Sequence, residues 1–411
     1  MGNISYFCIV KHLRHVLRLT ATIIFLLLTN NLRSQDAGPI FTNMDSVEIS
    51  LLTCQPREQI YSLYGHTAIR VKDIADDIDI AVNYGIFSFD KPYFVLRFVF
   101  GLTDYEMGVT DFEQFRRNYE ADNVGVRQQT LNLTAEEKSE ILKALAVNYE
   151  PQNRIYRYNY FYDNCTTRAR DILVSHIKGI IRYPARNSNK VSYRELIHSY
   201  NEHHRWARFG NDLLLGIKAD QPINRQEQQF LPDNLRSDFD NAVIVNVDHT
   251  KRPLVKQSSW VFSPYKIQYA DFFEITPRMC AIAFAIILIM ATIIERHLKK
   301  TFWGIDAFIL TVTGLCGIIL FAMIFSEHPA VSMNFQILLL NPLSLVFLFK
   351  TIKDLRKNKI PAWIMAWVFL LILFLMAGFF QKYAEGMYLV ALSLLIRYLF
   401  KLDQIISIKR K

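Results

Sequence analysis

The residue of this chain that most strongly indicates chemistry is a cysteine at the predicted start of a helix. In "YFYDNCTTRARDIL", Asp163 or Asn164 can cap a helix that begins at Cys165, and apolar residues follow on one helical face. A thiol in the first turn lies near the positive end of the helix dipole, which favours the thiolate and lowers the thiol pKa. The unpaired N–H groups of that turn can hold a developing oxyanion. The pattern therefore predicts that Cys165 is a nucleophile for acyl transfer.

A cysteine nucleophile needs a base, and the best candidate is a histidine in "YGHTAIRV". His66 opens a predicted strand, and Gly65 before it lets the backbone of another segment approach closely. The next predicted strand carries Asp79 and Asn83 on one face, because side chains alternate along a strand. We choose Asn83 as the group that orients the imidazole, since a neutral amide does so in Cys-His-Asn sites.

Two other interpretations of Cys165 remain open. An oxidising compartment permits a disulfide, and Cys54 is the one other cysteine outside the apolar segments and the predicted signal. A free buried cysteine can also serve only as a small hydrophobic residue. His176 lies three turns along the same predicted helix and cannot reach back, while adjacent His203 and His204 point apart. No metal and no other cofactor is expected.

These residues need a scaffold, and residues 36–275 are predicted to form a single α+β domain of ordinary size. Thr134 with Glu137 forms a capping box that predicts a helix over 134–150. The turn near Asp76 and Asp77 predicts that the strands on either side of it are antiparallel neighbours. "NDLLLGI" has a helical pattern, and "FLPDNL" has the composition of a turn. The predicted strands cover 46–54, 66–73, 77–87 and 123–133.

The amino-terminal segment predicts export. Basic residues precede the short apolar run "TATIIFLLLT", which is typical of a signal peptide within residues 1–35. An uncleaved anchor of the same orientation is the alternative. In either case the α+β domain is expected outside the cytoplasm.

The last third of the chain, residues 276–411, is predicted to be an all-α membrane domain of five helices. Lys and Arg gather in the loops 295–300 and 350–359 and in the tail 401–411, whereas 326–334 has none. By the positive-inside rule the basic loops and the carboxyl terminus are cytoplasmic. The net charge of +9 comes largely from them, so nucleic-acid binding is not expected. The candidate spans are 278–294, 302–325, 335–349, 362–380 and 386–400.

Five further residues are candidates for binding substrate. Tyr64 and Asn164 belong to the two motifs, and Arg70 (with Arg97 as another possibility) could hold a phosphate. Glu327 and His328 lie in a loop predicted to face the same side of the membrane as Cys165. The alternative for that loop is an interfacial turn in which a proline ends a helix.

The two motifs together resemble the papain-like NlpC/P60 superfamily in its circularly permuted form, where the histidine precedes the cysteine. The Asn-Cys helix start is similar to that of lecithin:retinol acyltransferase-type enzymes. Over nearly the whole mature chain the sequence resembles the Lnb-type lipoprotein N-acyltransferases of Bacteroidota. That resemblance is carried by "GHTAIRV", "VNYGIFSFDKPYFVLRFVFGLTDYEMGV", "NCTTRARD", "FLPDNL" and "FSEHPAVSMNFQILLLNPL".

The resemblance implies a papain-like periplasmic domain on a five-helix domain of the bacterial inner membrane, with Cys165 and His66 as catalytic residues. It implies N-acylation of the diacylglyceryl-cysteine of exported lipoproteins, with a phospholipid as acyl donor and the diacylated lipoprotein as acceptor. The chemistry argued above is compatible with this, since a cysteine can pass an acyl group through a thioester. A cell-wall peptidase, a phospholipase and a non-enzymatic membrane scaffold are the alternatives.

Overall fold

The computed structural model describes six stretches of the chain, and Asp45–Lys411 forms one compact unit. The predicted signal peptide, residues 1–35, lies outside the described residues. The stretches are 41, 43–59, 62–87, 92–185, 190–265 and 274–410.

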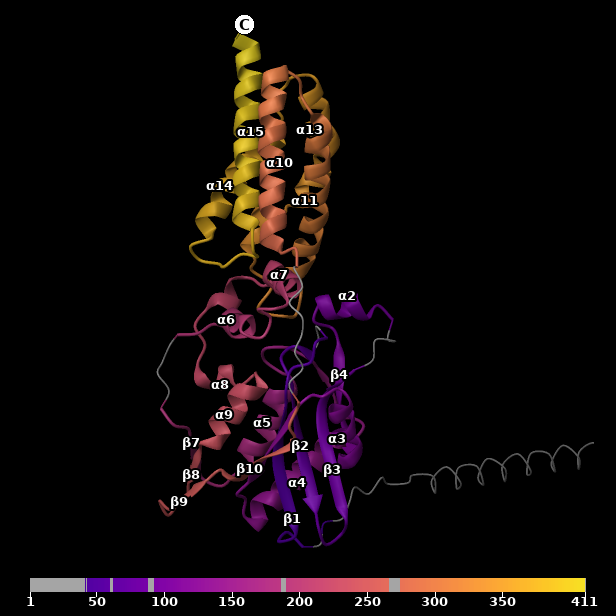
Figure 1. Ribbon diagram of the computed structural model, residues 1–411, viewed down its shortest axis with the longest axis vertical. Helices are drawn as coiled ribbons and strands as arrows, with labels where there is room; N and C mark the ends of the chain where they lie inside the picture. Colours follow the sequence, from indigo (N-terminus) through magenta and orange to yellow (C-terminus); the bar gives the residue numbers. More distant parts are fainter. Residues whose placement is uncertain are drawn as a thin grey trace, which may run out of the picture. The chain divides into compact units, whose positions relative to one another are not determined.

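A seven-stranded antiparallel sheet forms the centre of the amino-terminal domain (Figure 1). Its strand order is β10-β5-β1-β2-β3-β4-β6. The central strand β1 is buried along nearly its whole length, because both faces of the sheet are covered. The strands are β1 (Val47–Cys54), β2 (His66–Asp73), β3 (Ile78–Ile86), β4 (Asp104–Asp111), β5 (Val126–Leu131), β6 (Ile155–Arg157) and β10 (Val255–Phe262).

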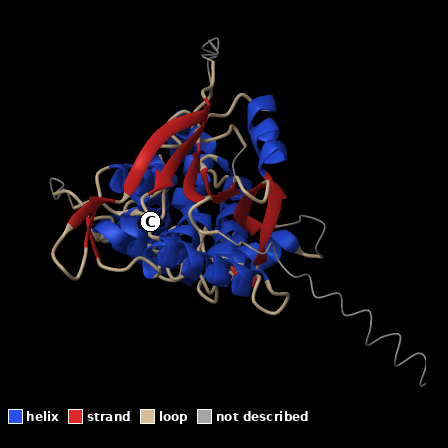
Figure 2. Ribbon diagram, turned by 90° about the horizontal axis from the view of Figure 1, so that it is seen from below, coloured by secondary structure: helices blue, strands red, loops and turns tan. Residues whose placement is uncertain are grey.

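Helices cover both faces of this sheet, and the strands in Figure 2 have helices on either side. Helix α5 (Cys165–Ser175) packs on β2 and β3, and α9 (Pro232–Asp240) packs on β1 and β10. The Thr67 hydroxyl of β2 contacts that of Thr166 in α5 at 3.0 Å. Helix α3 (Phe112–Ala121) covers the opposite face and packs on the alternate side chains of the strands.

Most of the predicted elements of this domain are confirmed. The four predicted strands appear as β1, β2, β3 and β5, and α4 (Ala135–Tyr149) starts with the predicted capping box. The predicted turn at "FLPDNL" is wrong, because Pro232 occupies the first position of α9, where a missing N–H costs nothing. The remaining elements of the domain are α2 (Phe94–Val99), β7 (Ile180–Arg182), α6 (Tyr193–His198), α7 (Arg205–Leu214), η2 (Ile217–Asp220), α8 (Arg225–Gln228), β8 (Val243–Val245) and β9 (Lys251–Pro253).

The carboxyl-terminal domain is helical and strongly apolar (Figure 1). By length and composition two described helices can cross a membrane, α10 (Pro277–Leu298) and α11 (Trp303–Met323). A pair bent by 78° adds a third if it counts as one span. The other elements are η3 (Phe335–Leu338), α12 (Leu343–Val346), α13 (Leu348–Arg356), the shorter apolar α14 (Ala362–Ala377) and α15 (Met387–Arg410).

One expectation for this domain is wrong. The predicted third span, 335–349, is not a continuous helix but is divided among η3, α12 and the start of α13. Pro342, which has no N–H to donate, lies at the break between η3 and α12. Helix α15 extends through the basic segment that follows the predicted fifth span, as far as Arg410.

Helix α15 carries two basic residues into the bundle because each finds acidic partners. Arg397 pairs with Glu295 of α10 and Asp306 of α11, both at 2.9 Å. Lys401 pairs with Glu295 at 2.9 Å and also with Asp306. Two cations and two anions therefore neutralise one another, and the cluster joins three helices.

Polar side chains of the helical domain cap the carbonyl end of α7 in the amino-terminal domain. Gln336 donates to the carbonyls of Asp212 and Leu213 at 2.8 and 3.1 Å. Asn334 donates to the Leu213 carbonyl at 2.8 Å, and Gln381 donates to that of Leu215 at 3.1 Å. The last carbonyls of a helix have no partner within the helix, so these amides satisfy groups that would otherwise be buried unpaired.

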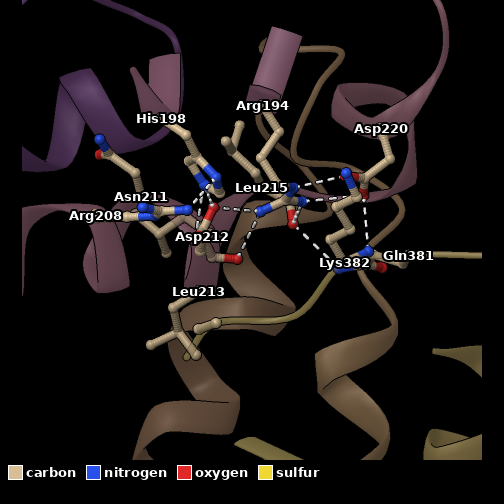
Figure 3. A network of polar contacts seen from close by, with 12 residues as sticks. Arg194, His198, Arg208, Asn211, Asp212, Leu213, Leu215, Asp220, Gln381 and Lys382 are labelled. Atoms are coloured by element: carbon tan, nitrogen blue, oxygen red, sulfur yellow. Dashed lines mark hydrogen bonds and ion pairs between the residues drawn. The ribbon is translucent and has the colours of Figure 1, made fainter. Parts of the chain in front are cut away.

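A buried arginine organises the same junction, as Figure 3 shows. Arg194 of α6 is fully buried and pairs with Asp212 at 2.8 Å and with Asp220 at 2.7 Å. His198 also contacts Asp212, at 2.8 Å, and the backbone N–H of Lys382 donates to Asp220 at 3.1 Å. One network therefore joins α6, α7, η2 and the loop before α15.

Replacing Arg194 by methionine should destabilise this junction strongly. Two carboxylates would remain buried with fewer partners, and breaking a buried pair in this way costs about 3–5 kcal/mol. Urea unfolding of the purified protein in detergent micelles measures the loss. Arg117→Met on the surface of α3 is the control, since this arginine is mostly exposed and its one ion pair within the described residues is with Glu113. Equal urea concentrations at half-unfolding for the two variants would contradict the structural role given to Arg194.

Candidate active site

The predicted cysteine and histidine meet at one edge of the sheet. Cys165 is the first residue of α5 and His66 the first residue of β2, and both are half-buried. The thiol and the imidazole lie close enough for each to shift the pKa of the other. The two residues are 99 positions apart in the chain, so the packing of α5 on β2 brings them together.

Asn83 lies on the other side of the imidazole. His66 Nε2 is 3.2 Å from Asn83 Oδ1. The Asn83 amide nitrogen contacts the Ala81 carbonyl and the Thr110 hydroxyl, both at 3.4 Å, which directs the amide oxygen toward His66. An amide oxygen only accepts, so Nε2 must carry a proton, and Nδ1 is the nitrogen that remains for the thiol. This is the orienting contact predicted for Asn83.

The surroundings of Cys165 favour its thiolate. Burial opposes ionisation, but the charge and hydrogen bond of His66 outweigh it, and the Thr67 N–H and the Thr166 hydroxyl add to their effect. Together they lower the pKa of the Cys165 thiol to about 7. Burial also opposes protonation of His66, yet the charge of Cys165 and the hydrogen bonds from Cys165 and Asn83 raise its pKa. The two shifts describe a thiolate–imidazolium pair near neutral pH.

Asn164 caps α5, and its side-chain amide is used within the protein. Its Oδ1 accepts from the Thr166 and Thr167 amides, each at 2.9 Å, and its Nδ2 donates to the carbonyls of Tyr160 and Phe230. The amide therefore has no group left for the predicted substrate contact. Of the first-turn N–H groups expected to hold an oxyanion, those of Thr166 and Thr167 are already used. The Cys165 amide makes no hydrogen bond to any group within the described stretches, so it remains available.

A glycine and a tyrosine that sequence reasoning missed complete the surroundings of the thiol. Gly85 has a φ of +90°, and β3 loses its register with β4 between Asn83 and Ile86. A Cβ at Gly85 would lie 3.8 Å from Cys165 Cβ and 3.8 Å from Tyr156 Oη. The irregular strand therefore leaves a space that the thiol and the phenol both border.

The Tyr156 hydroxyl is buried and has no hydrogen-bond partner in the described part of the chain. The ring is only 7% exposed, and the Arg168 guanidinium lies 3.5 Å from its centroid. Burial raises the pKa of Tyr156, and the charge of Cys165 raises it further, so the hydroxyl stays protonated and can donate. An unpaired buried donor is costly unless a ligand uses it. The aromatic run "YRYNYFYDN" in the sequence was a signal for this residue.

A cavity of about 470 Å³ opens on Asn83 from the side of α3. Arg57, which borders it, is paired with Asp122 at 2.8 Å and lies 4.4 Å from the Tyr119 ring centroid. Its positive charge opposes protonation of His66. The cavity is lined by Arg57, Asn83, Thr110, Phe115, Asn118, Tyr119, Ala121 and Asp122.

Two asparagine side chains hold the Tyr64 hydroxyl in place. The oxygen accepts from Asn211 at 2.8 Å and from Asn201 at 3.5 Å. Asn211 precedes Asp212 of the polar junction, so Tyr64 links the segment before His66 to α7. Its contacts favour a positioning role over the predicted substrate contact.

The structure does not bring Arg70 to the site. Its guanidinium forms two hydrogen bonds with Asp79 at 2.7 and 2.5 Å, and it also donates to Gln128. It lies 3.4 Å from the centroid of the Phe112 ring. A guanidinium with these partners is not free for a phosphate, so the prediction for Arg70 is wrong. The same contacts explain why Asp79 is not the partner of His66.

Glu327 and His328 lie in the loop after α11, and neither contacts Cys165. Glu327 pairs with Arg157 at 2.9 Å. His328 is 3% exposed, its Nε2 contacts the Phe98 carbonyl at 3.1 Å, and its ring lies 4.8 Å from that of Tyr160. Burial lowers its pKa and the hydrogen bond only partly offsets this. The loop is therefore a packed contact with the amino-terminal domain.

The disulfide alternative is wrong, because Cys54 and Cys165 are both free thiols. Cys54 is opposite His66 in the β1–β2 ladder and is hydrogen-bonded to Tyr119. Burial raises the pKa of the Cys54 thiol to about 12, so this cysteine is unreactive.

Fold and site together describe an α+β domain with a cysteine–histidine pair, joined to an apolar helical domain. Residues 40–201 match the family model described as the Lnb N-terminal periplasmic domain, and residues 268–410 match the Lnb transmembrane domain. The chain belongs to the Lnb-type lipoprotein N-acyltransferase family. The sheet-rich α+β class and the helical membrane domain are as predicted. The comparison with curated proteins and that with solved structures each found no match.

The alkylation rate of Cys165 should rise with pH through a midpoint near 7, because the thiolate is the reactive form. In His66→Ala the midpoint should move up to the ordinary value of 9.0 or beyond, since burial would then act unopposed. Timed iodoacetamide labelling with mass spectrometry of the Cys165 peptide measures both. Cys54 in the same sample is the unreactive control. A midpoint that is the same in both proteins would contradict the imidazole's role.

Proposed function

We propose that this protein transfers a fatty acyl group from a phospholipid to the α-amine of the diacylglyceryl-cysteine of lipoproteins, through a thioester on Cys165. Family membership supports an acyltransferase, and the lowered pKa of the Cys165 thiol beside His66 supports a covalent route. The observation that carries the proposal is the meeting of Cys165, at the start of α5, with His66, at the start of β2, in a domain joined to membrane helices.

In the first half-reaction the Cys165 thiolate attacks the carbonyl carbon of the phospholipid ester. The carbonyl oxygen becomes an oxyanion, which the Cys165 amide and the Tyr156 hydroxyl are placed to receive. The C–O bond then breaks, and His66 gives its proton to the leaving glycerol oxygen. A lysophospholipid departs, and the acyl group stays on sulfur as a thioester.

In the second half-reaction the lipoprotein amine attacks the thioester carbonyl. His66 is now neutral and accepts the proton that the amine loses as the amide bond forms. Departure of the thiolate restores the original pair, so each cycle consumes one phospholipid and one lipoprotein amine. The amine has an ordinary pKa near 8, so a nearby base increases its reactive fraction.

The membrane domain explains how both lipid substrates reach the site. Transfer of an acyl chain from the bilayer into water costs about 0.8 kcal/mol per CH₂. A soluble enzyme would have to extract the whole chain and offset this cost with its own apolar contacts. A site held beside the membrane needs to withdraw only the ester. The positive-inside pattern supports placing the domain on the periplasmic side of the inner membrane.

Expression in bacteria that lack lipoprotein N-acylation tests the proposal. Mass spectrometry of lipoprotein amino termini should find an added acyl group with the wild-type chain and none with Cys165→Ala. A Cys165→Ser variant should retain an acyl adduct as an oxygen ester, because the alkoxide is a poorer leaving group than the thiolate. Diacylated termini in cells making wild-type protein would overturn the proposal. An acyl adduct that never passes to lipoprotein would indicate a phospholipase instead.

Tyr156→Phe should lower the rate of acyl transfer about 100-fold, the cost of removing one oxyanion donor. The substitution keeps the ring, its contact with Arg168 and the pKa balance at Cys165. Single-turnover formation of the Cys165 thioester from a phospholipid measures the rate.

Tyr84→Phe is the matched control for that experiment. The Tyr84 hydroxyl is also buried and unpaired among the described residues, and its ring packs edge-on against Tyr156. It is not subject to the charge of Cys165, so its loss should leave the rate nearly unchanged. Equal rates for the two variants, or a Tyr156→Phe rate close to wild type, would remove Tyr156 from the mechanism. The alkylation rate of Cys165 should be the same in all three proteins.

A further inference from the structure

Helix α2 presents exposed apolar side chains although it belongs to the domain outside the predicted membrane spans. Leu96 is 57% exposed and Phe98 is 37% exposed, and Tyr93 and Leu102 at the two ends of the helix are exposed as well. We call these four residues the α2 surface, and the partly exposed Arg97 lies among them in the sequence. Exposed apolar side chains gathered in one short segment often mark an interaction site.

The carboxyl end of α2 is fixed to the loop that follows α11. Three consecutive carbonyls of α2 and its C-cap accept hydrogen bonds from three consecutive residues of that loop. The pairs are Phe98 with His328 Nε2 at 3.1 Å, Val99 with Ser326 Oγ at 2.8 Å, and Phe100 with the Glu327 amide at 2.9 Å.

The contact between α2 and this loop is also close. Gly101, with a φ of +71°, follows the helix, and a Cβ there would lie only 3.0 Å from Glu327 Cβ. A hydrogen-bonded cap together with such an approach leaves α2 little freedom to move away from the end of α11.

This attachment sets the depth of α2 relative to a bilayer. Phe321 in the last turn of α11 and Phe325, two residues beyond its end, are both exposed. Ser326 and Glu327, which hold α2, follow them directly, so α2 lies where the apolar surface of α11 ends. That level corresponds to the boundary between acyl chains and headgroups, where apolar and aromatic side chains of amphipathic elements reside.

A row of aromatic rings runs from α2 to the nucleophile. Ring centroids are 6.4 Å apart from Phe98 to Phe94, 5.5 Å from Phe94 to Phe87, and 4.8 Å from Phe87 to Tyr105. Tyr105 and Cys165 both lie within 4 Å of the point that a Cβ on Gly85 would occupy. The row therefore begins at the α2 surface and ends beside the thiol.

We propose that the α2 surface lies in the headgroup region of the bilayer and that a phospholipid acyl chain passes from it along the aromatic row toward Cys165. The occupant of the surface is the bilayer, because α2 is hydrogen-bonded to the loop that directly follows the membrane helix α11. The use of this lipid as acyl donor rests on the proposed function, whereas the contact with the bilayer does not.

Photo-crosslinking tests the bilayer contact independently of catalysis. A benzophenone amino acid in place of Leu96, in the full chain reconstituted into phosphatidylethanolamine–phosphatidylglycerol vesicles, should form a phospholipid adduct on irradiation. Ile180 of β7 is the matched control, since it is 62% exposed but belongs to the separate three-stranded sheet. Mass spectrometry should find the adduct at position 96 and not at 180. No phospholipid adduct at position 96, or equal amounts at both positions, would overturn the proposal.

A charge on the α2 surface tests the route of the acyl chain. The measured quantity is the rate of Cys165 acylation by vesicle phospholipid divided by the rate with p-nitrophenyl butyrate, a water-soluble ester. Leu96→Glu should lower this ratio by about tenfold or more, because a carboxylate resists insertion among acyl chains. Ile180→Glu should leave the ratio at the wild-type value. An unchanged ratio in Leu96→Glu would overturn the route, whether both rates stay the same or both fall together.

These experiments separate the inference from the proposed function. If the wild-type protein acylates Cys165 from neither ester while the adduct at position 96 still forms, the transferase proposal fails and the bilayer contact stands. If the wild type acylates Cys165 from vesicles but position 96 gives no adduct, the inference fails and the transferase proposal stands.

Discussion

The contact between the Cys165 thiol and the His66 imidazole is the interaction on which the site depends. A thiolate in a half-buried site is unfavourable alone, and here burial alone would raise the pKa of Cys165. The imidazolium reverses that shift, but only while both groups are held within hydrogen-bonding reach. The sheet supplies His66 at the start of β2, and the Asn164 cap determines where α5 begins. The irregular β3 at Gly85 leaves a space that Cys165 and Tyr156 border.

The polar groups around this pair divide into those already used and those left for a substrate. Asn164 makes four hydrogen bonds and Asn83 directs its oxygen to the imidazole, so both serve the architecture of the site. The Tyr156 hydroxyl is buried without a partner among the described groups, and a donor left in this way has a free-energy cost. We propose that an oxyanion in the transition state accepts the hydrogen bond that this hydroxyl lacks. Such an oxyanion is stabilised by donors that are in place before the reaction begins.

The site is attached to the membrane domain by polar contacts as well as by a shared apolar cluster. Amides of Asn334, Gln336 and Gln381 cap α7, and residues 326–328 cap α2, so two helices of the amino-terminal domain end on groups of the helical domain. Directional hydrogen bonds set position and orientation more narrowly than apolar packing does. Tyr64 extends this network toward His66 through Asn211. A fixed height above the bilayer is useful to an enzyme whose substrates are both lipids.

Local signals in the sequence determined the elements and the two reactive residues. Alternation located β1, β2, β3 and β5, a capping box located α4, and an Asn before a Cys located the start of α5, because each depends on neighbouring residues. Helix caps and strand alternation do not reveal distant partners. The pairing of Arg70 with Asp79 and Gln128, the break in the third apolar segment, and the place of β10 beside β5 required the tertiary structure. The role of Tyr156 as an oxyanion donor also required the tertiary structure. Its hydroxyl is unpaired among the described groups, and whether a donor is satisfied depends on residues far along the chain.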